Sequence, residues 1–306
     1  MNKAWIGAAK PASWPKLLVP FVLGQAIGLG AGDSAWTERT LAFGLGLVFT
    51  VLDLLFIVFL NDWGDREVDA IKRQMFPKSS QKTVPDGLLA AHQLLFAGLA
   101  AGGLALAVAV VSGVLLGRPW LGPLAAGALG IFVAYTLPPL KLNYRGGGEL
   151  LEMAGVGLVL PAFHMYLQGG EVAPGVALLP GFALLSLASA VASGLSDERS
   201  DRAGGKHTFV TRFGNAAGRR TTEVLAFAGA TLWAGSGWFA GTPVWVGAGA
   251  ALVAYWYVGG TFARSGRAKT DRFSAQRQYK GALHHAIWRG GASAAMLLAA
   301  WHLLLQ

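Results

Sequence analysis

Two short clusters of carboxylates carry the strongest chemical signal in this sequence. In the first, Asn61-Asp62-Trp63-Gly64-Asp65-Arg66-Glu67-Val68-Asp69, the residues Asn61, Asp65 and Asp69 recur every four positions. On a helix that spacing stacks their side chains on one face. Like charges at that spacing repel, so the pattern favours a cation between them, and hard oxygen ligands suit Mg²⁺. Taken alone, the cluster also fits a solvated loop that pairs with its own Arg66 and Lys72.

The second cluster repeats this pattern later in the chain. Asp197 and Asp201 are again four residues apart, and a basic, glycine-rich stretch follows them, Arg202-Ala203-Gly204-Gly205-Lys206-His207-Thr208. Two carboxylate pairs at one depth, flanked by lysine and arginine, fit a diphosphate held through bridging magnesium ions. With both clusters present, we favour such a site over a solvated loop.

The elements that must position these clusters are membrane helices. The 306 residues are 54% hydrophobic and only 13% charged, with a mean hydropathy of +0.47. A soluble core of this size needs more surface charge, and a disordered chain would be poor in leucine, valine and phenylalanine. The absence of cysteine excludes disulfides, thiolate metal sites and a cysteine nucleophile. We expect an integral, multi-pass membrane protein with the lipid bilayer as partner and no nucleic-acid partner.

Apolar stretches long enough to cross about 30 Å of hydrocarbon predict nine transmembrane helices in an all-α bundle. They cover about 15–29, 36–60, 88–116, 120–137, 150–167, 174–195, 224–240, 244–262 and 282–305. We expect one domain over 1–306 and no removable signal peptide. Long charged connections follow the second and the sixth helix, which hints at four-helix pseudo-repeats, about 10–140 and 145–262, plus a ninth helix.

The distribution of positive charge predicts the orientation of this bundle. With nine helices, all of the 25 basic residues except Arg39 and Arg118 fall on the same side as the N-terminus. Because lysine and arginine accumulate in cytoplasmic loops, we expect a cytoplasmic N-terminus, in a membrane of the bacterial inner type. The long charged connections 61–87 and 197–220 then place any polar chemistry on the cytoplasmic face.

The paired motifs resemble those of the UbiA superfamily of intramembrane aromatic prenyltransferases. Asn61-Asp62-x-x-Asp65-x-x-x-Asp69 and Asp197-x-x-x-Asp201 look like its two aspartate-rich motifs. The segment Tyr135-Thr136-Leu137-Pro138-Pro139 is similar to the family's Tyr-x-x-Pro-Pro, and Gly148-Glu149 fits as well. The motifs that carry this resemblance lie within about residues 10–215, and the predicted number of helices extends the resemblance to the whole chain.

The resemblance implies nine helices around a central cavity, open to the cytoplasm and sideways to lipid. It implies Mg²⁺-dependent transfer of a prenyl group from an allylic diphosphate to a hydrophobic or aromatic acceptor, in quinone or related isoprenoid-lipid biosynthesis. The metal and diphosphate ligands carried over from the family are Asn61, Asp65, Asp69, Asp197 and Asp201. The Pro-Pro segment and the second motif look closer to the naphthoquinone and chlorophyll/tocopherol branches than to the 4-hydroxybenzoate branch.

The chemistry itself also requires such residues. Breaking the C–O bond to diphosphate develops negative charge on the leaving group, which Mg²⁺ and fixed cations stabilise; the candidates are Lys82, Lys141, Arg145 and Lys206. An aromatic face stabilises the allylic cation, and Tyr135 is the first candidate, before Trp63 and Phe163. Together with Tyr135 we assign Asp65 and Asp197 to catalysis. Lys82 stands where the family usually has arginine, in a longer connection after Asp69, so closure over the site is expected to differ.

Several further residues have alternative interpretations. Asp53, inside the second predicted helix, is either near an acceptor pocket or in a structural hydrogen bond. Glu149 and Glu152 stand at a helix start, where the dipole favours acids, so we favour structural roles for them. His164 and Tyr166 are more typical of packed core positions than of acceptor contacts. The basic run 264–280 is expected to meet anionic lipid.

Two other functions compete with aromatic prenyl transfer. A cyclase, or an enzyme that prenylates a non-aromatic lipid acceptor, would use the same ionisation. A transporter would use the carboxylates to bind a cation, but it predicts acids near mid-membrane. Here Asp53 is the acidic residue at such a depth, whereas the two clusters lie at the ends of predicted helices.

Overall fold

Long helices form the body of the molecule, as the apolar stretches predict. The computed structural model describes residues 3–31, 34–79, 81–238 and 241–304, and this part of the chain contains helices, turns and loops but no strand. The long helices are α2 (Pro15–Gly28), α3 (Trp36–Gly64), α5 (Ala91–Leu115), α6 (Leu121–Thr136), α10 (Leu179–Ser193), α12 (Phe209–Gly235), α13 (Val244–Ser265) and α14 (Phe273–Leu304). The fifth predicted helix is a composite of α8 (Gly148–Ala154), a π-helical turn (Gly155–Val159) and α9 (Leu160–Gly169).

Each of the nine predicted stretches coincides with helix in the described residues, but the number of membrane spans stays a prediction. Within the described residues, five segments are long and apolar enough to cross a membrane: Trp36–Gly64, Ala91–Leu115, Gly148–Gly169, Pro174–Ser196 and Val244–Ser265. Helices α2 and α6 are apolar but shorter, and α12 and α14 begin in charged sequence. The side of the membrane on which the N-terminus lies also stays a prediction.

Several helices begin earlier than the apolar pattern predicts. Helix α12 starts at Phe209 rather than near 224, with a kink at Gly214 (φ 84°, ψ 164°), and α14 starts at Phe273 rather than near 282. Helical hydrogen bonding can continue into polar sequence outside the hydrocarbon, so hydropathy marks the membrane segment rather than the helix. The predicted end points at 240 and 305 lie outside the described residues.

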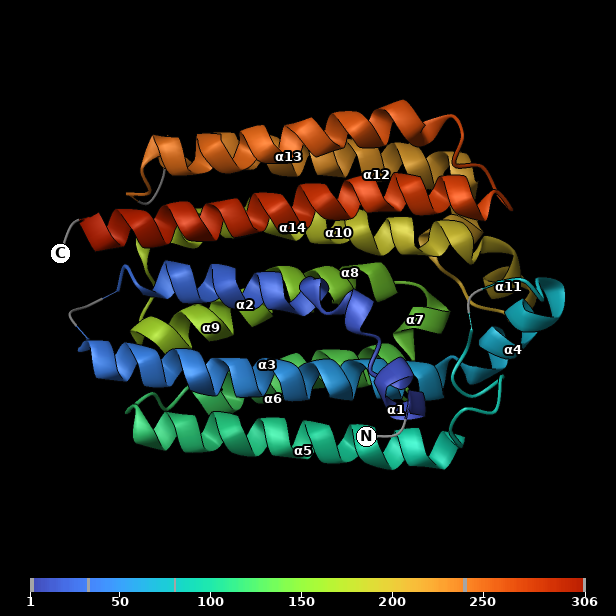
Figure 1. Ribbon diagram of the computed structural model, residues 1–306, viewed down its shortest axis with the longest axis horizontal. Coiled ribbons are helices and arrows are strands. Elements are labelled where there is room, and N and C mark those ends of the chain that lie inside the picture. The colour runs from blue at the N-terminus through green and yellow to red at the C-terminus, as the bar shows by residue number, and fades with distance from the viewer. Residues whose placement is uncertain (1–2, 32–33, 80, 239–240, 305–306) are drawn as a thin grey trace.

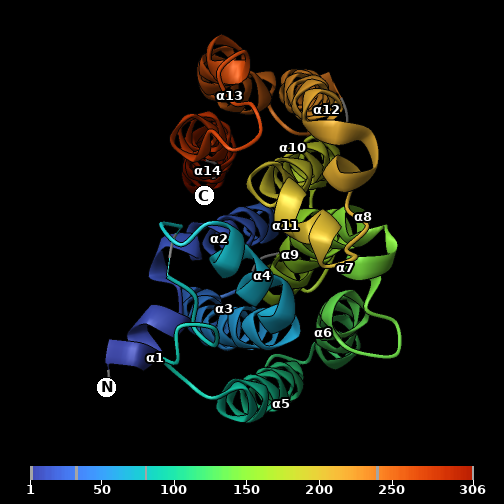
Figure 2. The same cartoon turned by 90° about the vertical axis from the view of Figure 1, so that its right-hand side faces the viewer.

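Short helices gather at one end of the bundle, called here the site end. They are α4 (Arg66–Met75), α7 (Leu142–Arg145) and α11 (Glu198–Ala203). Figure 1 shows all three in the right-hand part of the molecule, with α4 and α11 at its right edge. Helices α4 and α11 lie side by side there; a Cβ atom on Gly204 would come within 2.5 Å of Cγ2 of Val68. Viewed from this end, α2, α3, α6, α8 and α10 surround the middle of the molecule (Figure 2).

Glycines allow the long helices to approach closely. A Cβ atom on Gly181 of α10 would lie 2.7 Å from the carbonyl oxygen of Gly229 in α12, and one on Gly24 of α2 would lie 2.3 Å from the carbonyl oxygen of Pro161 in α9. Such contacts between backbones are typical of helices packed in membranes, where small residues replace a hydrophobic driving force. They bring α2 against α9 and α10 against α12.

The first carboxylate cluster does not lie on one unbroken helix. Helix α3 ends at Gly64, Asp65 has φ −94° and ψ 3°, and α4 starts at Arg66. The i to i−4 hydrogen bonds nevertheless continue, from the N–H of Asp65 to the Asn61 carbonyl (2.9 Å) and from the N–H of Asp69 to the Asp65 carbonyl (2.8 Å). The kink turns α4 across the site end, so the three side chains do not share one straight face, contrary to the expectation for a continuous helix.

Candidate active site

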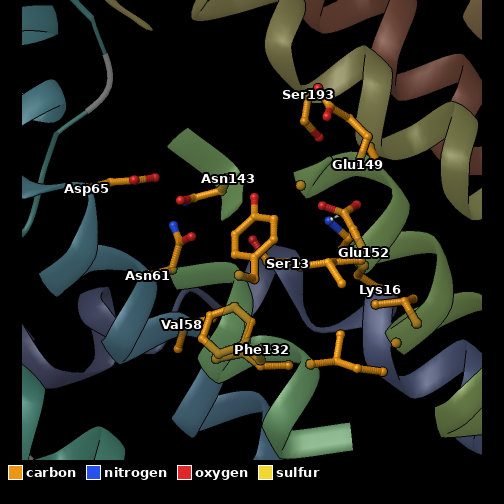
Figure 3. A pocket seen from close by; sticks show the side chains of 18 of the residues that line it. Ser13, Lys16, Val58, Asn61, Asp65, Phe132, Asn143, Glu149, Glu152 and Ser193 are labelled. Carbon is orange, nitrogen blue, oxygen red and sulfur yellow. Dashed lines mark ion pairs between the residues drawn. The ribbon is translucent and has the colours of Figure 1, made fainter. Parts of the chain in front are cut away.

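A cavity of about 320 Å³ lies between α3, α6, α8 and α10. One part of its wall is apolar and includes Leu54, Ile57, Val58, Phe132 and Leu160, whereas the part near the site end is polar. Figure 3 shows Asn61, Asp65 and Asn143 pointing toward one another on one side, above Val58 and Phe132. The π-helical turn contributes Gly155 and Val156 to the wall. The cavity therefore joins an apolar chamber to a set of polar groups.

A lysine that follows each aspartate cluster in the sequence forms an ion pair with an aspartate of the other cluster. The ammonium of Lys206, in the stretch after the second cluster, lies 3.1 and 3.2 Å from the two carboxylate oxygens of Asp65. Lys72, on α4 in the first cluster, contacts Asp197 in the second. Burial works to lower the pKa of Lys206, but Asp65 and Asp201 outweigh it and raise that pKa. These two crossed ion pairs bring the two aspartate motifs together.

Asp201 has a different environment from its neighbours. It is buried, and no ion pair to it occurs in the part of the chain that the structure describes. Burial, together with the nearby charges of Asp197 and Asp65, raises the pKa of Asp201 to about 7 although Lys206 opposes the shift. Burial also works to raise the pKa of Asp197, but Lys72 and Lys280 outweigh it and lower that pKa. Asp201 is therefore the carboxylate in this pair that has no ion-pair partner among the described residues.

The structure brings together some of the predicted site residues and separates others. Asn61, Asp65, Asp197, Asp201, Lys206 and Tyr135 line the cavity. Asp69 and Lys82 form an ion pair with each other at 2.5 Å and are not among the lining residues. Lys141 lies with its ammonium 3.7 Å from the centre of the Tyr144 ring, and Arg145 is exposed; neither lines the cavity. Their predicted contacts with diphosphate stay predictions.

Among the aromatic candidates, the cavity distinguishes Tyr135 from the other two. Trp63 lies beneath the guanidinium of Arg66, whose carbon is 5.0 Å from the indole centre. Phe163 is fully buried and packs on Phe49 at 4.2 Å between ring centres. Neither lines the cavity, whereas Tyr135 does.

The residues with alternative interpretations also have defined places. Asp53 is buried and lines the cavity. A carboxylate oxygen of Glu149 accepts the backbone N–H of Phe209 at 2.6 Å, at the start of α12, which is a structural role. Glu152 lines the cavity and pairs with Lys16 at 2.6 Å. His164 is buried between Phe21 and Phe163, as expected of a core residue.

Sequence reasoning missed two residues of the site. Lys72 was expected to contribute to the charge orientation or to pair within its own loop, because no local pattern reveals a partner 125 residues away. Asn143, on α7, is buried, lines the cavity, and has neither amide atom in a hydrogen bond within the described structure. The available signal for Asn143 was an amide residue in the short stretch between Pro139 and the glycine run 146–148.

The donor set around the polar end fits a magnesium ion that is shared with a phosphate ligand. Among the described residues, no three carboxylate or imidazole groups converge closely enough to form a metal cage by themselves. Magnesium, however, usually takes one or two protein carboxylates and completes its shell with water and substrate phosphates. Asn61, Asp65, Asp197 and Asp201 offer such oxygens in the lining of the cavity, and the unpartnered Asn143 amide adds a buried polar group.

Comparison with known proteins shows what this arrangement is similar to. The sequence profile described as "UbiA prenyltransferase family" matches residues 17–283. A 1,4-dihydroxy-2-naphthoate octaprenyltransferase from Mycobacterium leprae is 27% identical over 228 residues, 73% of this chain and 74% of that protein. A chloroplastic chlorophyll synthase from Oryza sativa subsp. japonica is 27% identical over 70% of this chain, which spans only 56% of that longer protein.

The fold also matches solved structures. A UbiA homolog from Archaeoglobus fulgidus, solved bound to GPP and Mg²⁺, superposes with a TM-score of 0.70 at 16% identity, over 99% of each chain. An apo UbiA homolog from Aeropyrum pernix K1 gives a TM-score of 0.68 at 12% identity, over 92% of this chain and 97% of that one. At these identities the likeness establishes the shared fold.

Proposed function

The chain belongs to the UbiA prenyltransferase family, and from that premise we propose that it transfers a prenyl group from an allylic diphosphate to a hydroxylated aromatic acceptor, with Mg²⁺ as cofactor. The observation that carries this proposal is the two-part cavity. An apolar chamber suits an isoprenoid chain, and the crossed Asp65–Lys206 and Asp197–Lys72 pairs stand at its polar end. An intramembrane site with paired carboxylates and ammonium groups suits a ligand that is a hydrocarbon at one end and a polyanion at the other.

Magnesium would be held by Asn61, Asp65, Asp197 and Asp201, and it would stabilise the charge that develops on the leaving diphosphate. Asp201 supports this assignment because, of these three aspartates, it is the one that has no ion pair among the described residues. Asp69 belongs to the family motif and stays a predicted ligand, although it lies outside the cavity lining and pairs with Lys82.

The other residues of the cavity have roles that follow from their chemistry. Lys206 and Lys10 line the polar end and can donate hydrogen bonds to diphosphate oxygens. The Tyr135 ring faces the same cavity and can stabilise the allylic cation through its π-electrons. The apolar side chains around Phe132 keep water away from that cation. Together these groups separate the two charges that ionisation creates.

Similarity supports an aromatic acceptor and a quinone-related product. Relatives matching over 70% or more of this chain are named for a naphthoate substrate and for chlorophyll synthesis. The acceptor class, the role in quinone or related isoprenoid-lipid biosynthesis and a site facing the cytoplasm of a bacterial-type membrane are parts of the proposal. The orientation is supported by the charge distribution of the sequence.

The test is ionisation of geranyl diphosphate by purified protein in lipid nanodiscs, measured as release of inorganic diphosphate. We expect release to require Mg²⁺, to stop in excess EDTA, and to fall by at least about 100-fold in Asp65→Asn and Asp197→Asn, because each removes charge from the leaving-group site. Release that survives both substitutions or excess EDTA would contradict the magnesium site. Release without any prenylated aromatic product would favour cyclisation or a non-aromatic acceptor.

A further inference from the structure

Six carboxylates line the cavity, and most of them already have a function. They are Asp53, Asp65, Glu149, Glu152, Asp197 and Asp201. The three aspartates 65, 197 and 201 belong to the diphosphate end, and Glu149 is engaged by the N–H of Phe209. Glu152 and Asp53 are therefore the two lining carboxylates to which no role has yet been assigned.

Glu152 is distinguished by its partner and its place. Its carboxylate, on α8, is 2.6 Å from the ammonium of Lys16 on α2, and the two side chains are 15% and 34% exposed. Figure 3 shows this pair on the opposite side of the cavity from Asn61 and Asp65. A charged pair in a membrane protein is costly and is usually retained for function. The pair presents a proton acceptor and a proton donor across the cavity from the diphosphate end.

This pair lies between the main cavity and a smaller one. A small cavity of about 10 Å³ adjoins the main one, and Lys16, Glu152 and Val156 line both. Phe182, Trp288 and Ser186 form the far side of the small cavity. The Ser186 hydroxyl is buried and has no hydrogen-bond partner in the described structure. The small cavity has room for a water molecule but not for a ring, so an aromatic acceptor would lie in the main cavity, with Glu152 and Lys16 between it and these side chains.

We propose that Glu152 is the general base that removes the proton from the ring carbon of a hydroxylated aromatic acceptor, and that Lys16 positions its carboxylate. This assignment rests on the proposed function. When the C–O bond of the allylic diphosphate breaks, its electron pair leaves with diphosphate. A π-electron pair of the ring forms the new C–C bond. The C–H bond at that carbon then breaks, its electrons restore the aromatic ring, and the proton passes to the Glu152 carboxylate.

Asp53 is the competing candidate for this base, and the geometry disfavours it. It stands eight residues before Asn61 on α3, about 12 Å along the helix axis, toward the apolar part of the cavity. No lysine or arginine forms an ion pair with it in the residues that the structure describes. The ring that attacks the first carbon of the prenyl group must lie beside the diphosphate, and Glu152 faces Asn61 and Asp65 from the opposite side of the cavity.

The experiment measures two products from one reaction, with geranyl diphosphate as donor and 1,4-dihydroxy-2-naphthoate as acceptor probe in nanodiscs. We expect Glu152→Gln to lower the ratio of prenylated naphthoate to geraniol by about 100-fold, the scale of general-base catalysis. We also expect a deuterium isotope effect at the reacting ring carbon to exceed the wild-type value, because proton removal becomes slow. Glu152→Asp, which keeps a carboxylate, should recover part of the ratio.

Matched variants make the result decisive. Glu171→Gln is the same chemical change at an exposed position between α9 and the next helical turn, and it should leave the ratio unchanged. Lys16→Met should lower the ratio and Lys16→Arg should restore it, whereas Asp65→Asn should lower diphosphate release itself. An unchanged ratio and isotope effect in Glu152→Gln, or a larger fall of the ratio in Asp53→Asn, would overturn the assignment. Wild-type protein that releases no diphosphate would instead refute the proposed function.

Discussion

The cluster on α3 and α4 and the cluster at the start of α11 hold the same residue types at the same spacing, yet their charges are balanced differently. In the first cluster, Asp62 contacts Lys10, Asp65 pairs with Lys206, and Asp69 pairs with Lys82. In the second, Asp197 contacts Lys72, whereas Asp201 has no ion pair within the described structure. The two clusters share a sequence pattern but differ in how many of their carboxylates form ion pairs.

This difference suggests a division of labour between the clusters. The lysine-paired carboxylates are held in place in the absence of ligand, and each ammonium group that leaves a carboxylate can turn to a phosphate oxygen. Asp201 forms no ion pair in the part of the chain that the structure describes, so a divalent ion that binds it displaces only a proton. We expect the first cluster to hold the site in its folded arrangement before ligand binds. We expect the second cluster to provide, in Asp201, the carboxylate that binds metal most readily.

The largest effect, on the free energy of unfolding, should come from breaking the ion pair between Asp65 and Lys206. Lys206→Met leaves the Asp65 carboxylate, only 15% exposed, without its ammonium partner. Removing one member of a buried pair costs about 3 kcal/mol or more, so we expect a clear fall in thermal unfolding temperature in detergent without metal. Magnesium should restore much of the loss because it supplies the missing positive charge. Lys72→Met should destabilise less, since Asp197 is 37% exposed; equal effects would contradict the comparison.

The second effect separates Asp201 from Asp69 as metal ligands. Asp201→Asn should weaken Mn²⁺ binding in the presence of inorganic diphosphate by at least about 100-fold, measured by electron paramagnetic resonance titration. Asp69→Asn should change it less, because Asp69 already pairs with Lys82 outside the cavity lining. If the Asp69 variant loses as much affinity as the Asp201 variant, both clusters supply metal ligands equally, as the sequence motif alone predicts.

The third effect is a pH dependence of metal binding. The pKa of Asp201 is raised to about 7 by burial and by the charges of Asp197 and Asp65. Below pH 7 a metal ion must displace the Asp201 proton, so Mn²⁺ affinity should fall by up to about tenfold for each pH unit. Above pH 7 the dependence should flatten.

The same raised pKa has a consequence for stability in the absence of metal. Since the folded state keeps a proton that the unfolded state releases, stability should fall as the pH rises from the ordinary aspartate value of 3.8 to about 7. Asp201→Asn should remove both dependences. A pH profile of Mn²⁺ binding that is identical in wild type and in this variant would assign the titration to another group.

The sequence predicts the helical architecture and the pairing of the clusters well, for physical reasons. Hydropathy locates helices because a membrane forces every backbone hydrogen bond into them, and the spacing of Asp197 and Asp201 points directly to a shared face. It does not predict the kink at Asp65 or the ion pair of Lys72 with Asp197, because both depend on how α4 crosses the site end. The position of Asn143 in the cavity wall likewise depends on tertiary contacts, which the sequence does not reveal.

The smallest effect should come from the contact that holds the second cluster from outside. Arg199 on α11 contacts Asp271 in the connection between α13 and α14, and the two side chains are 53% and 39% exposed. Exposed ion pairs contribute less than about 1 kcal/mol, so Arg199→Ala should change neither the unfolding temperature nor Mn²⁺ affinity appreciably. Arg66→Ala, which removes a similarly peripheral contact from the first cluster, is the matched control. A large loss of metal affinity in Arg199→Ala alone would mean that the connection between α13 and α14 positions Asp201, and that the second cluster depends on distant support which the first does not need.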